Sequence, residues 1–365
     1  LSTTSSGIFS DGTTEPLKEL NDSKDADFGD IDGDGDLDII VANWGMGNEV
    51  TRQNRLYLND GNGNFTDITA SALPIDTDFS WDAEFGDVDG DCDLDIFIAN
   101  DFYQNRLYLN DGSGNFTDGT IYSLPIDSDW SLDATLGDVD GDGDLDIFIA
   151  NEDSQNRLYL NDGSGNFTDV TGSALPVDNE WCWNADFADV ENDGDLDIFI
   201  SGEWGHLYLN DGSGIFIDGT TSASLAGIQY CFDADFADIN GDNYLDLFLA
   251  IEISRNRLYL NNGSGNFIDV SNGSLPLDTD NSLSTKFGDV DGNGTLDIII
   301  GNSLQDRLYL NDGNGLFTDV TGSALPADTD MSIDIDFGDV NGDGDLDIFK
   351  STWNNDAWNR LLLNE

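Results

Sequence analysis

The chain has 365 residues, of which 74 are acidic and only 12 are Lys or Arg, so its formal net charge is −62. This balance excludes nucleic acid as a natural partner, because phosphate binding requires a cationic surface. Of the acidic residues, 64 are Asp and 10 are Glu. A merely solvated surface would use both carboxylates, so this bias indicates that the shorter Asp is required at fixed positions, as in calcium loops.

The chain opens with a strand signal at 7–14, whose letters G-I-F-S-D-G-T-T match the segment at 214–221. A unit of four strand signals follows, first at 26–29, 37–42, 55–58 and 64–68, with the hairpin turn N-D-G-N-G at 59–63 and an S-A-L-P linker at 71–74. The unit recurs with a period of about 50 residues, which is typical of a propeller blade. No 3.6-residue apolar pattern of useful length supports a helical repeat.

Seven such units predict seven blades, and their first loops begin at Asp30, Asp87, Asp138, Asp189, Asp238, Asp289 and Asp339. The last unit stops after its third strand at 359–365, and the strand at 7–14 can supply the missing fourth. We therefore expect an all-β, seven-bladed β-propeller of four-stranded antiparallel blades, closed by the N-terminal strand, with residues 1–365 as one domain.

Each loop between the first and second strand has the pattern D-x-[DNE]-x-[DN]-x-x-x-D. Calcium takes six to eight oxygen ligands, which alternate positions of a tight loop can direct inward. An EF-hand is excluded, because the twelfth position holds a strand residue instead of the bidentate Glu. Gly35 supplies the positive φ of the turn, and Cys92 at the equivalent place predicts strain in the second loop.

The loops predict up to seven Ca²⁺ ions, one in each blade, and each ion has five expected ligand positions. They are Asp30, Asp32, Asp34, Asp36 and Asp38; Asp87, Asp89, Asp91, Asp93 and Asp95; Asp138, Asp140, Asp142, Asp144 and Asp146; Asp189, Glu191, Asp193, Asp195 and Asp197; Asp238, Asn240, Asp242, Tyr244 and Asp246; Asp289, Asp291, Asn293, Thr295 and Asp297; Asp339, Asn341, Asp343, Asp345 and Asp347. The longer Glu191 and the neutral Asn240 and Asn293 predict weaker binding in the fourth to sixth loops than in the first and third.

The units resemble FG-GAP repeats of the VCBS type, which build the seven-bladed propeller of integrin α subunits and related propeller lectins. The name-giving pair stands at Phe28-Gly29, Phe85-Gly86, Phe287-Gly288 and Phe337-Gly338. Leu136 replaces the Phe in the third unit, and Ala188 and Ala237 replace the Gly in the fourth and fifth. The resemblance implies calcium loops between the first two strands of a blade, and analogy with similar loops implies that Asp36 contributes its backbone carbonyl.

All eight Trp are expected in the loops opposite the calcium loops, namely those from strand two to three and from strand four to the next blade. Aromatic side chains there give large, rigid contact area that suits a sugar face or a protein. The alternative is that they pack as plugs over the central channel. The residues predicted to bind ligand are Phe79, Trp81, Trp130, Trp181, Trp183 and Tyr230.

The cations and cysteines follow the repeat. An Arg recurs in the third strand of six units, with His206 in its place in the fourth, which favours ion pairs within the scaffold. Cys182 and Cys231 share one register in adjacent blades, so the sequence leaves open whether they form a disulfide.

These features favour an extracellular or cell-surface, secreted recognition and adhesion module that binds glycan or extracellular protein through the Trp-rich face. The chain lacks both a leader and the roughly 18 consecutive apolar residues of a membrane span, so a soluble form is expected. A polysaccharide lyase is the first alternative, although few cations remain to neutralise an acidic substrate. A packing subunit of an extracellular filament or sheath is the second, and self-assembly stays open.

Overall fold

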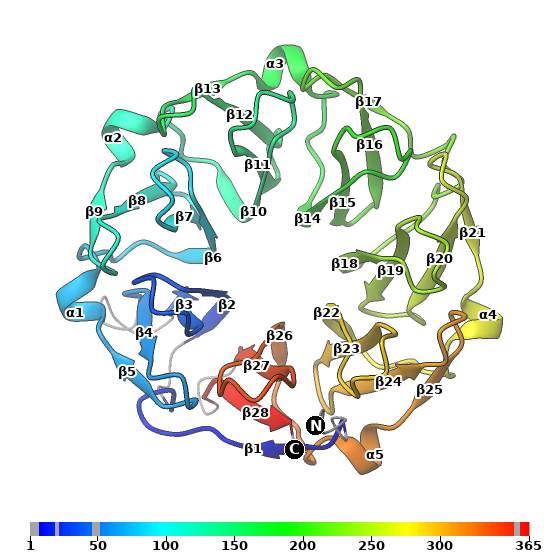
Figure 1. Ribbon diagram of the computed structural model, residues 1–365. Coiled ribbons are helices and arrows are strands. Elements are labelled where there is room, and N and C mark those ends of the chain that lie inside the picture. The colour runs from blue at the N-terminus through cyan, green and yellow to red at the C-terminus, as the bar shows by residue number, and fades with distance from the viewer. Residues whose placement is uncertain (1–6, 19–21, 46–51, 354–357, 365) are drawn as a thin grey trace.

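The computed structural model describes residues 7–18, 22–45, 52–353 and 358–364. These residues form seven four-stranded antiparallel sheets arranged as blades around a central axis (Figure 1). The first strand of each blade lies nearest the axis, and the fourth lies at the rim. The seven-bladed, all-β propeller expected from the repeat is therefore confirmed.

The first four blades occupy 23–218. They are formed by β2 (Ser23–Gly29), β3 (Asp38–Asn43), β4 (Arg55–Asn59) and β5 (Phe65–Asp67); β6 (Ser80–Gly86), β7 (Asp95–Asn100), β8 (Arg106–Asn110) and β9 (Phe116–Asp118); β10 (Trp130–Gly137), β11 (Asp146–Glu152), β12 (Arg157–Asn161) and β13 (Phe167–Asp169); β14 (Cys182–Ala188), β15 (Asp197–Gly202), β16 (His206–Asn210) and β17 (Phe216–Asp218).

The remaining three blades complete the ring. They are formed by β18 (Cys231–Ala237), β19 (Asp246–Ile251), β20 (Arg257–Asn261) and β21 (Phe267–Asp269); β22 (Ser282–Gly288), β23 (Asp297–Asn302), β24 (Arg307–Asn311) and β25 (Phe317–Asp319); β26 (Ser332–Gly338), β27 (Asp347–Thr352), β28 (Arg360–Asn364) and β1 (Phe9–Asp11).

The ring closes through the N-terminal strand. In the last blade β1 pairs antiparallel with β28, with Phe9 opposite Asn364, so segments from the two ends of the chain share one sheet (Figure 1). The amide of Gly12 extends the pairing by donating to the carbonyl of Leu361 at 2.9 Å. Closure in this way removes the open edge that an unpaired β28 would present.

Five linkers contain a single helical turn that the sequence patterns did not predict. These turns are α1 (Thr69–Ala72), α2 (Thr120–Ser123), α3 (Thr171–Ala174), α4 (Ser271–Ser274) and α5 (Thr321–Ala324). In α1 the Thr69 hydroxyl accepts the amide of Leu56, and the carboxylate of Asp67 accepts the amide of Thr69. Four residues are too few to show a helical apolar period. Among the described residues, no helix is long and apolar enough to cross a bilayer.

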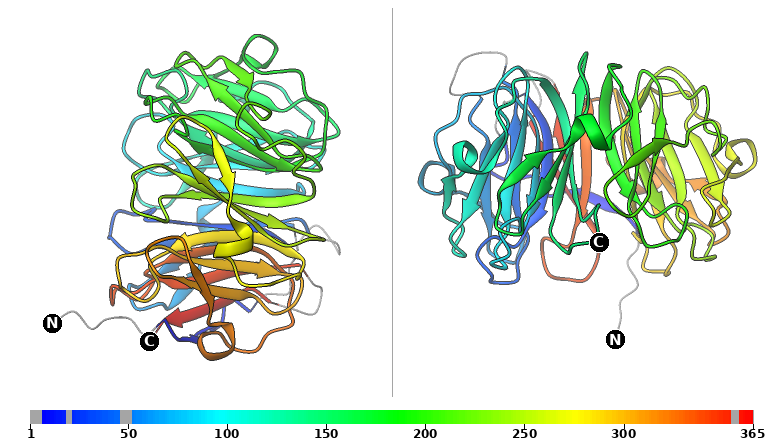
Figure 2. Two further views of the ribbon diagram at one scale, coloured as in Figure 1. Left: turned by 90° about the vertical axis from the view of Figure 1, so that its right-hand side faces the viewer. Right: turned by 90° about the horizontal axis from the view of Figure 1, so that it is seen from above.

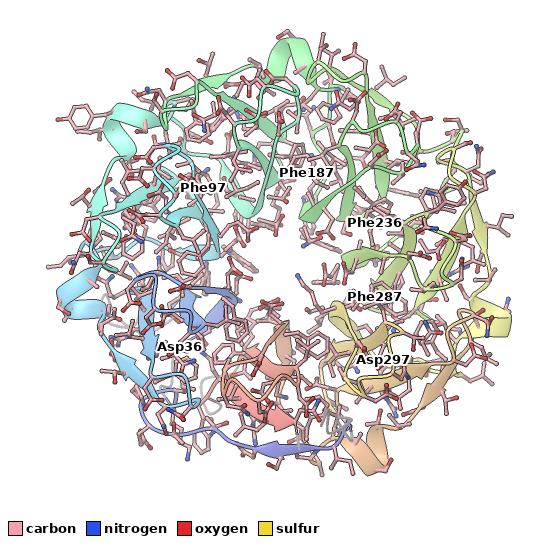
Figure 3. The ribbon with its side chains drawn as sticks, viewed as in Figure 1. Asp36, Phe97, Phe187, Phe236, Phe287 and Asp297 are labelled. Carbon is pink, nitrogen blue, oxygen red and sulfur yellow. The ribbon has the colours of Figure 1, made fainter. Side chains whose placement is uncertain are left out.

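The Phe-Gly pair joins neighbouring blades. A Cβ added to Gly29 would lie 2.9 Å from the ring of Phe85 in the next blade, so the glycine allows the two strands to approach closely. Phe28 packs edge-on against Phe349 of the preceding blade at 6.2 Å between ring centroids. Figure 3 labels the equivalent rings Phe187, Phe236 and Phe287. The cores therefore lie between blades, as the buried clusters shared by adjacent sheets show.

A buried polar contact also recurs between blades. The residue before the third-strand Arg donates its side-chain amide to the first residue of the next blade, as Asn256 does to the hydroxyl of Ser282 at 2.9 Å. Asp306 replaces this Asn in the sixth blade, and the fully buried Lys350 lies 2.6 Å from its carboxylate and also contacts Asp328. Lys350 occupies a strand position that is apolar in the other six blades, so the Asp and the Lys depart from the repeat together.

This pair predicts a compensating double substitution. Lys350→Ile leaves Asp306 buried without its cation and should lower the free energy of unfolding by about 3–5 kcal/mol. Asp306→Asn combined with Lys350→Ile restores the residues of the other blades and should recover most of that loss. Denaturant unfolding of the parent, both single variants and the double variant measures the coupling. A double variant as unstable as Lys350→Ile alone would show that the two departures are independent.

Candidate functional site

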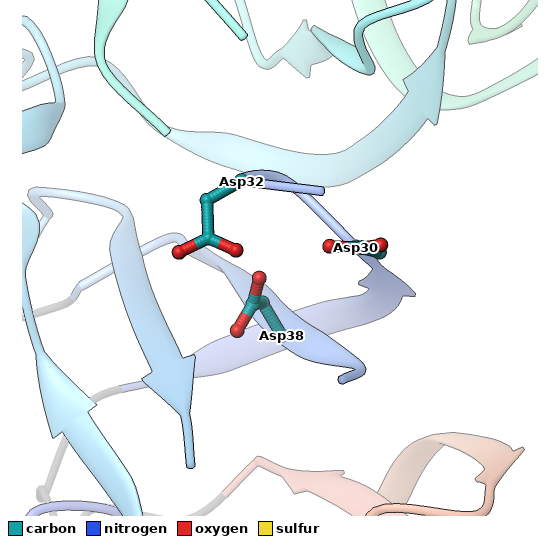
Figure 4. Close-up of side chains that lie close together, drawn as sticks. All are labelled: Asp30, Asp32 and Asp38. Carbon is teal, nitrogen blue, oxygen red and sulfur yellow. The ribbon is translucent and has the colours of Figure 1, made fainter. Parts of the chain in front are cut away.

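The first candidate site is the loop between the first two strands of a blade. Asp30, Asp32 and Asp38 direct their carboxylates toward one another in the first blade (Figure 4), and each offers an oxygen within 4.8 Å of the others. Calcium-to-oxygen distances are about 2.3–2.6 Å, so ligands on opposite sides of one ion lie about 5 Å apart. Matching groups occur at Asp87, Asp89 and Asp95; Asp138, Asp140 and Asp146; and Asp289, Asp291 and Asp297. These four loops could each hold a metal ion.

The last Asp of each loop is fixed by the strands around it. In the first blade, Asp38 accepts the amide of Asn59 at 2.8 Å and that of Ile31 at 3.1 Å. Burial raises the pKa of Asp38 to about 6, and the nearby loop carboxylates act in the same direction. The scaffold therefore fixes the position of the Asp38 side chain, and the surroundings destabilise its charged form. Both effects favour a cation beside it.

The turn of the loop requires a left-handed backbone. Gly35 has a φ of 96°, and the equivalent Cys92 and Asn243 have φ angles of 75° and 67°. A side chain in this region costs conformational energy. The strain predicted for Cys92 in the second loop is confirmed, although that loop still brings its three carboxylates together.

The seventh residue of a loop, Asp36 in the first blade, directs its side chain away from the other loop carboxylates. A Cβ added to Gly61, in the β4–β5 hairpin, would lie 2.4 Å from the carboxylate of Asp36, so that carboxylate lies against the glycine. Tyr244 and Thr295 lie against the equivalent glycines of their own blades. The arrangement leaves the backbone carbonyl as the group that this position can turn toward an ion.

The fourth, fifth and seventh loops do not form such a three-carboxylate group among the described residues. Asn240 in the fifth loop donates its amide to Asp246 at 3.0 Å and so occupies one oxygen of the closing carboxylate. The sixth loop keeps its three carboxylates despite the neutral Asn293. The loops therefore differ in the charge that they offer a cation.

The second candidate site lies at the opposite end of the strands. In the first blade, β2 pairs with β3 so that Gly29 lies opposite Asp38, at the loop end, and Ser23 lies opposite Asn43, at the other end. Trp44 directly follows Asn43. Figure 2 shows the ring from the side, with the two ends of the strands on opposite faces.

The expectation that every Trp lies in a loop is wrong for Trp81, Trp130 and Trp183, because the first strands start earlier than the Phe-Gly signal indicates.

Every first strand contains a bulge near its start. In the first blade the register shifts between Ser23 and Asp25, and the same shift recurs in the other six blades. A bulge adds one residue to the strand and re-aims a side chain. The added residues form what we call the mouth ring: Lys24, Trp81, Leu132, Trp183, Phe232, Leu283 and Ile333.

The mouth ring encloses a cavity of about 270 Å³ at the axis, which we call the aromatic funnel. Trp181 and Trp353 extend its wall, and both side chains are partly exposed. Trp183 stacks on Phe232 with ring centroids 4.3 Å apart and an interplanar angle of 22°. The funnel therefore combines flat aromatic faces with aliphatic side chains around an opening to solvent.

Lys24 is held inside a box of three indoles beside the funnel. Its ammonium lies 3.4 Å from the ring centroid of Trp353, 4.2 Å from that of Trp81 and 5.5 Å from that of Trp44. Burial lowers the pKa of Lys24 to about 7, and the charges of Asp22 and Asp101 oppose that shift. The box shows that the aromatic side chains of this face accommodate an ammonium group.

The six predicted ligand-binding aromatics do not line one site. Trp81, Trp181 and Trp183 line the funnel. Trp130 packs on Phe102 at 4.7 Å between ring centroids and is absent from the funnel wall.

The other two predicted aromatics lie elsewhere on the same face. Phe79 lies between Trp44 and Tyr103, at 5.3 and 5.8 Å. Tyr230 lines a separate cavity of about 360 Å³ with Arg257 and Tyr259.

Below the funnel lies a ring of mostly acidic residues, which we call the upper ring: Asp25, Asp82, Asp133, Asn184, Asp233, Ser284 and Asp334. Several of its members join one blade to the next. The carboxylate of Asp82 accepts the amide of Ala134 at 3.1 Å, and that of Asp334 closes the ring by accepting the amide of Ala26 at 3.3 Å. Burial, reinforced by Asp25 and Asp133, raises the pKa of Asp82 well above its usual range.

A second ring lies two residues deeper and is called the lower ring: Asp27, Glu84, Thr135, Asp186, Asp235, Lys286 and Asp336. Five of its members line a cavity of about 110 Å³ that also reaches the upper ring. Burial lowers the pKa of Lys286, but the carboxylates around it, Asp336 and Asp235 first, outweigh burial and raise it. The two rings together hold ten carboxylates and one ammonium group.

Sequence reasoning missed these rings. Their signal is an acidic residue at every second position of the first strand, as in the D-A-D-F-G of 25–29, with small variations in each unit. A strand next to a propeller axis points alternate residues into the channel. These acidic residues lie before the Phe-Gly pair and outside the calcium loops, so neither motif indicates their place around the axis.

The third-strand cations have the scaffold role that their register predicted. Arg106 pairs with Asp78 at 2.6 Å and with Asp118 at 3.4 Å, and His206 lies 3.1 Å from Glu180. Cys182 and Cys231 are free thiols, which answers the question left open by the sequence.

Each of these two thiols takes the place of the Ser hydroxyl in the buried contact between blades. Cys182 accepts the amide of Asn156 at 3.2 Å, and Cys231 lies 3.4 Å from the hydroxyl of Ser201. Both thiols are therefore part of a polar contact with a partner other than each other.

Comparisons with known proteins agree with the repeat. A family model described as FG-GAP-like repeat matches residues 30–98, 87–149, 138–200, 238–300 and 289–349. No curated protein gives a match.

Solved structures share the fold. An Agrocybe aegerita lectin, described for specific recognition of non-reducing terminal N-acetylglucosamine, is 22% identical with a TM-score of 0.52, over 80% of this chain and 78% of that one. BBS1N in complex with ARL6DN is 13% identical, with a TM-score of 0.60 over 98% and 97% of the chains in the lead-soaked crystal and 0.58 over 100% and 98% in the mercury-soaked crystal.

The upper ring predicts a pH-dependent stability. Burial, with a contribution from Asp233, raises the pKa of Asp133 to about 8. The folded state therefore holds a proton that the unfolded state loses above about pH 4, so this residue lowers stability as the pH rises from 4 to 8. Asp133→Asn keeps an oxygen for the amide of Ala185, and Asn184 can rotate its amide to accept from the new group.

The stabilising effect of Asp133→Asn should therefore increase between pH 5 and pH 8, by about 1 kcal/mol or more. Denaturant unfolding of parent and variant at both pH values provides the measurement, and differences between the two proteins cancel the titration of all other groups. An effect of equal size at both pH values would contradict the proposed ionisation.

Proposed function

Because the chain belongs to the FG-GAP-like repeat family, we propose that it is an extracellular, calcium-stabilised recognition module that binds glycan or protein at its aromatic funnel. The observation that carries the proposal is the funnel itself. It is an axial cavity of about 270 Å³ that combines flat indole rings, aliphatic side chains and convergent carboxylates. Cavities that are mostly apolar with a few placed polar groups are the usual form of a ligand site.

Calcium is the metal that best fits the loops. Their donors are hard carboxylate oxygens with no thiol or imidazole, and four loops bring three such oxygens within 4.8 Å of one another. The ion would be held by Asp30, Asp32 and Asp38 in the first blade and by their equivalents elsewhere. Bound there, calcium supplies positive charge that neutralises the loop carboxylates.

The mouth ring departs from the sevenfold repeat of the scaffold, and this departure supports recognition at the funnel. The mouth ring carries Lys, Trp, Leu, Trp, Phe, Leu and Ile at positions that are equivalent in the scaffold. Its members vary while the strands behind them repeat, as expected when a ligand, and not the fold, determines the residue. Large aromatic anchors in a cavity are also the usual centre of a binding surface.

A lyase remains the second candidate, and Lys24 is the observation that bears on it. A lysine with a pKa near 7 suits a general base. Its side chain is nevertheless 3% exposed and enclosed by three indoles, which keeps the ammonium from a substrate. The enclosure favours a non-enzymatic module, and absence of glycan cleavage by the calcium-loaded protein is the corresponding expectation.

Removal of calcium should destabilise the fold. Each filled site contributes about 2.7 kcal/mol at a Ca²⁺ concentration 100 times its dissociation constant, and removal also restores repulsion among the loop carboxylates. Excess chelator should therefore lower the Tm sharply, and added Ca²⁺ should reverse the loss. A melting curve that is unchanged by chelator would contradict the calcium role.

Ligand binding should depend on the funnel tryptophans. Trp183→Ala removes a stacked face and should weaken binding to a glycan or protein ligand by about 2 kcal/mol or more, with little change in Tm or calcium affinity. Trp130→Ala is the matched control, because it removes the same side chain outside the funnel wall. A glycan array followed by titration of the best ligand provides the measurement. Equal losses in both variants would place the binding surface elsewhere on this face.

A further inference from the structure

We propose that the axial channel binds a primary ammonium group on a slender aliphatic stem, with the stem in the aromatic funnel and the ammonium between the upper and lower rings. The inference rests on the proposed recognition function, because it names the chemical class of ligand for that same funnel.

The funnel and the acidic cavity share a wall. The residues that line both are Asp25, Asp82, Asp133, Asn184, Asp233 and Asp334. The floor of the aromatic funnel is therefore the roof of the acidic cavity. A ligand that enters between the indoles meets carboxylates from five of the seven blades without leaving the axis.

The channel holds far more acidic groups than cations. Its two rings hold ten carboxylates against the single ammonium of Lys286, whose nearest described partner is Asp336 at 4.0 Å. Contacts between blades occupy some oxygens, since Asp27 and Asp235 each accept two backbone amides from phenylalanines. These contacts orient the carboxyl groups but supply no positive charge. Burial raises the pKa of Asp82 and Asp186 well above the usual range, so the rings retain protons that an ammonium group would displace.

Asp186 is the independent sign of a ligand. It lies in the lower ring and lines the acidic cavity, deep inside the channel. Its Oδ2 atom is closed to solvent and accepts no hydrogen bond from any described residue. A buried carboxylate oxygen without a donor is costly, and an ammonium group would supply three donors. Asn184, one level higher, likewise has an unpartnered Oδ1 that faces the same space.

The spacing favours an ammonium group over a metal ion. In the part of the chain that the structure describes, every group of three acidic side chains with oxygens within 4.8 Å lies in a loop, and none lies in the channel. A calcium ion needs such close oxygens, whereas an ammonium group can bridge carboxylates that lie farther apart through hydrogen bonds of about 2.8 Å. The channel is thus too wide for direct coordination and suited to a larger cation.

The protein already places its own amines in both parts of the channel. Lys286 inserts an ammonium into the lower ring, and Lys24 holds one among the indoles of Trp44, Trp81 and Trp353. These two side chains occupy the first and sixth blades only. The walls at Trp183, Leu132 and Phe232 remain open to an external stem.

The test compares two small probes of equal shape in saturating Ca²⁺, which keeps the loops filled. Isothermal titration with n-pentylamine should show binding at least tenfold tighter than with 1-pentanol, and the difference should shrink in high salt. The two probes differ only in the ammonium group, so aromatic contact alone cannot separate them. Equal affinities, or no binding of either probe, would overturn the inference.

Substitutions locate the ammonium group. Asp186→Asn should weaken pentylamine binding at least tenfold, and Lys286→Met should strengthen it, because the variants remove an attracting and a competing charge. Asp162→Asn is the matched control, since it removes one negative charge from an exposed outer hairpin. Melting curves verify that each variant is folded. An unchanged affinity in folded Asp186→Asn, or a loss as large in Asp162→Asn, would contradict a site in the channel.

Two further ligands distinguish the sources of such a group. Glucosamine and Nα-acetyl-lysine amide present the ammonium of an amino sugar and of a protein side chain, and N-acetylglucosamine and Nα,Nε-diacetyl-lysine amide are their neutral controls. Preference for the lysine amine over its acetylated form supports the inference, because that amine is carried on an aliphatic stem. Preference for glucosamine alone would contradict the proposed stem, because its ammonium group is attached to the sugar ring. If neither amine is preferred while a glycan or protein still binds in a Trp183-dependent way, the proposed function stands and the ammonium inference fails.

Discussion

Repulsion between carboxylates is the constraint on which the rest of this structure depends. A closed ring of seven similar blades repeats every side chain around one axis, so an acidic residue in the repeat becomes a ring of acidic residues in the fold. Such rings persist only if each carboxylate gains a cation, a proton or a set of hydrogen bonds. The chain uses all three solutions in different parts of the blade.

At the rim, fixed cations solve the problem. Third-strand arginines pair with aspartates of the linker and of the fourth strand, as Arg157 does with Asp129 and Asp169. Two residues farther along the same strand, a tyrosine hydroxyl satisfies another linker aspartate, as Tyr159 does for Asp127. Nearest the axis the space between blades is smallest, and Lys286 is the only cation that reaches the lower ring among the described residues. The other carboxyl groups near the axis therefore depend on protons and backbone hydrogen bonds, and burial raises the pKa of Asp82 and Glu84 well above the usual range.

The fold could be predicted from the sequence because the chain is built of repeats. The spacing of Asp30, Asp87 and their equivalents defined seven blades, and the match of 7–14 to 214–221 identified the closing strand. The three-carboxylate groups of four loops were likewise predictable, because each loop is a short, local pattern. The channel was not predictable in this way, since its rings join residues about 50 positions apart that meet only when the ring closes. The bulge that re-aims Trp81 and Trp183 has no local turn signal, which is why both were placed in loops.

Residues that differ from their equivalents in the other blades can be interpreted once the whole ring is known. Lys350 and Asp306 break the pattern together and satisfy each other inside the fold, so this departure is structural. Lys24 and Lys286 also break the pattern, and both lie at the axis, where three indoles enclose Lys24 and ring carboxyl groups surround Lys286. Asn184 and Ser284 break it by removing charge from the upper ring, in the fourth and sixth blades. The asymmetry of the channel is thus built from substitutions that tune charge while the strands stay constant, as expected of a site whose scaffold is already stable without them.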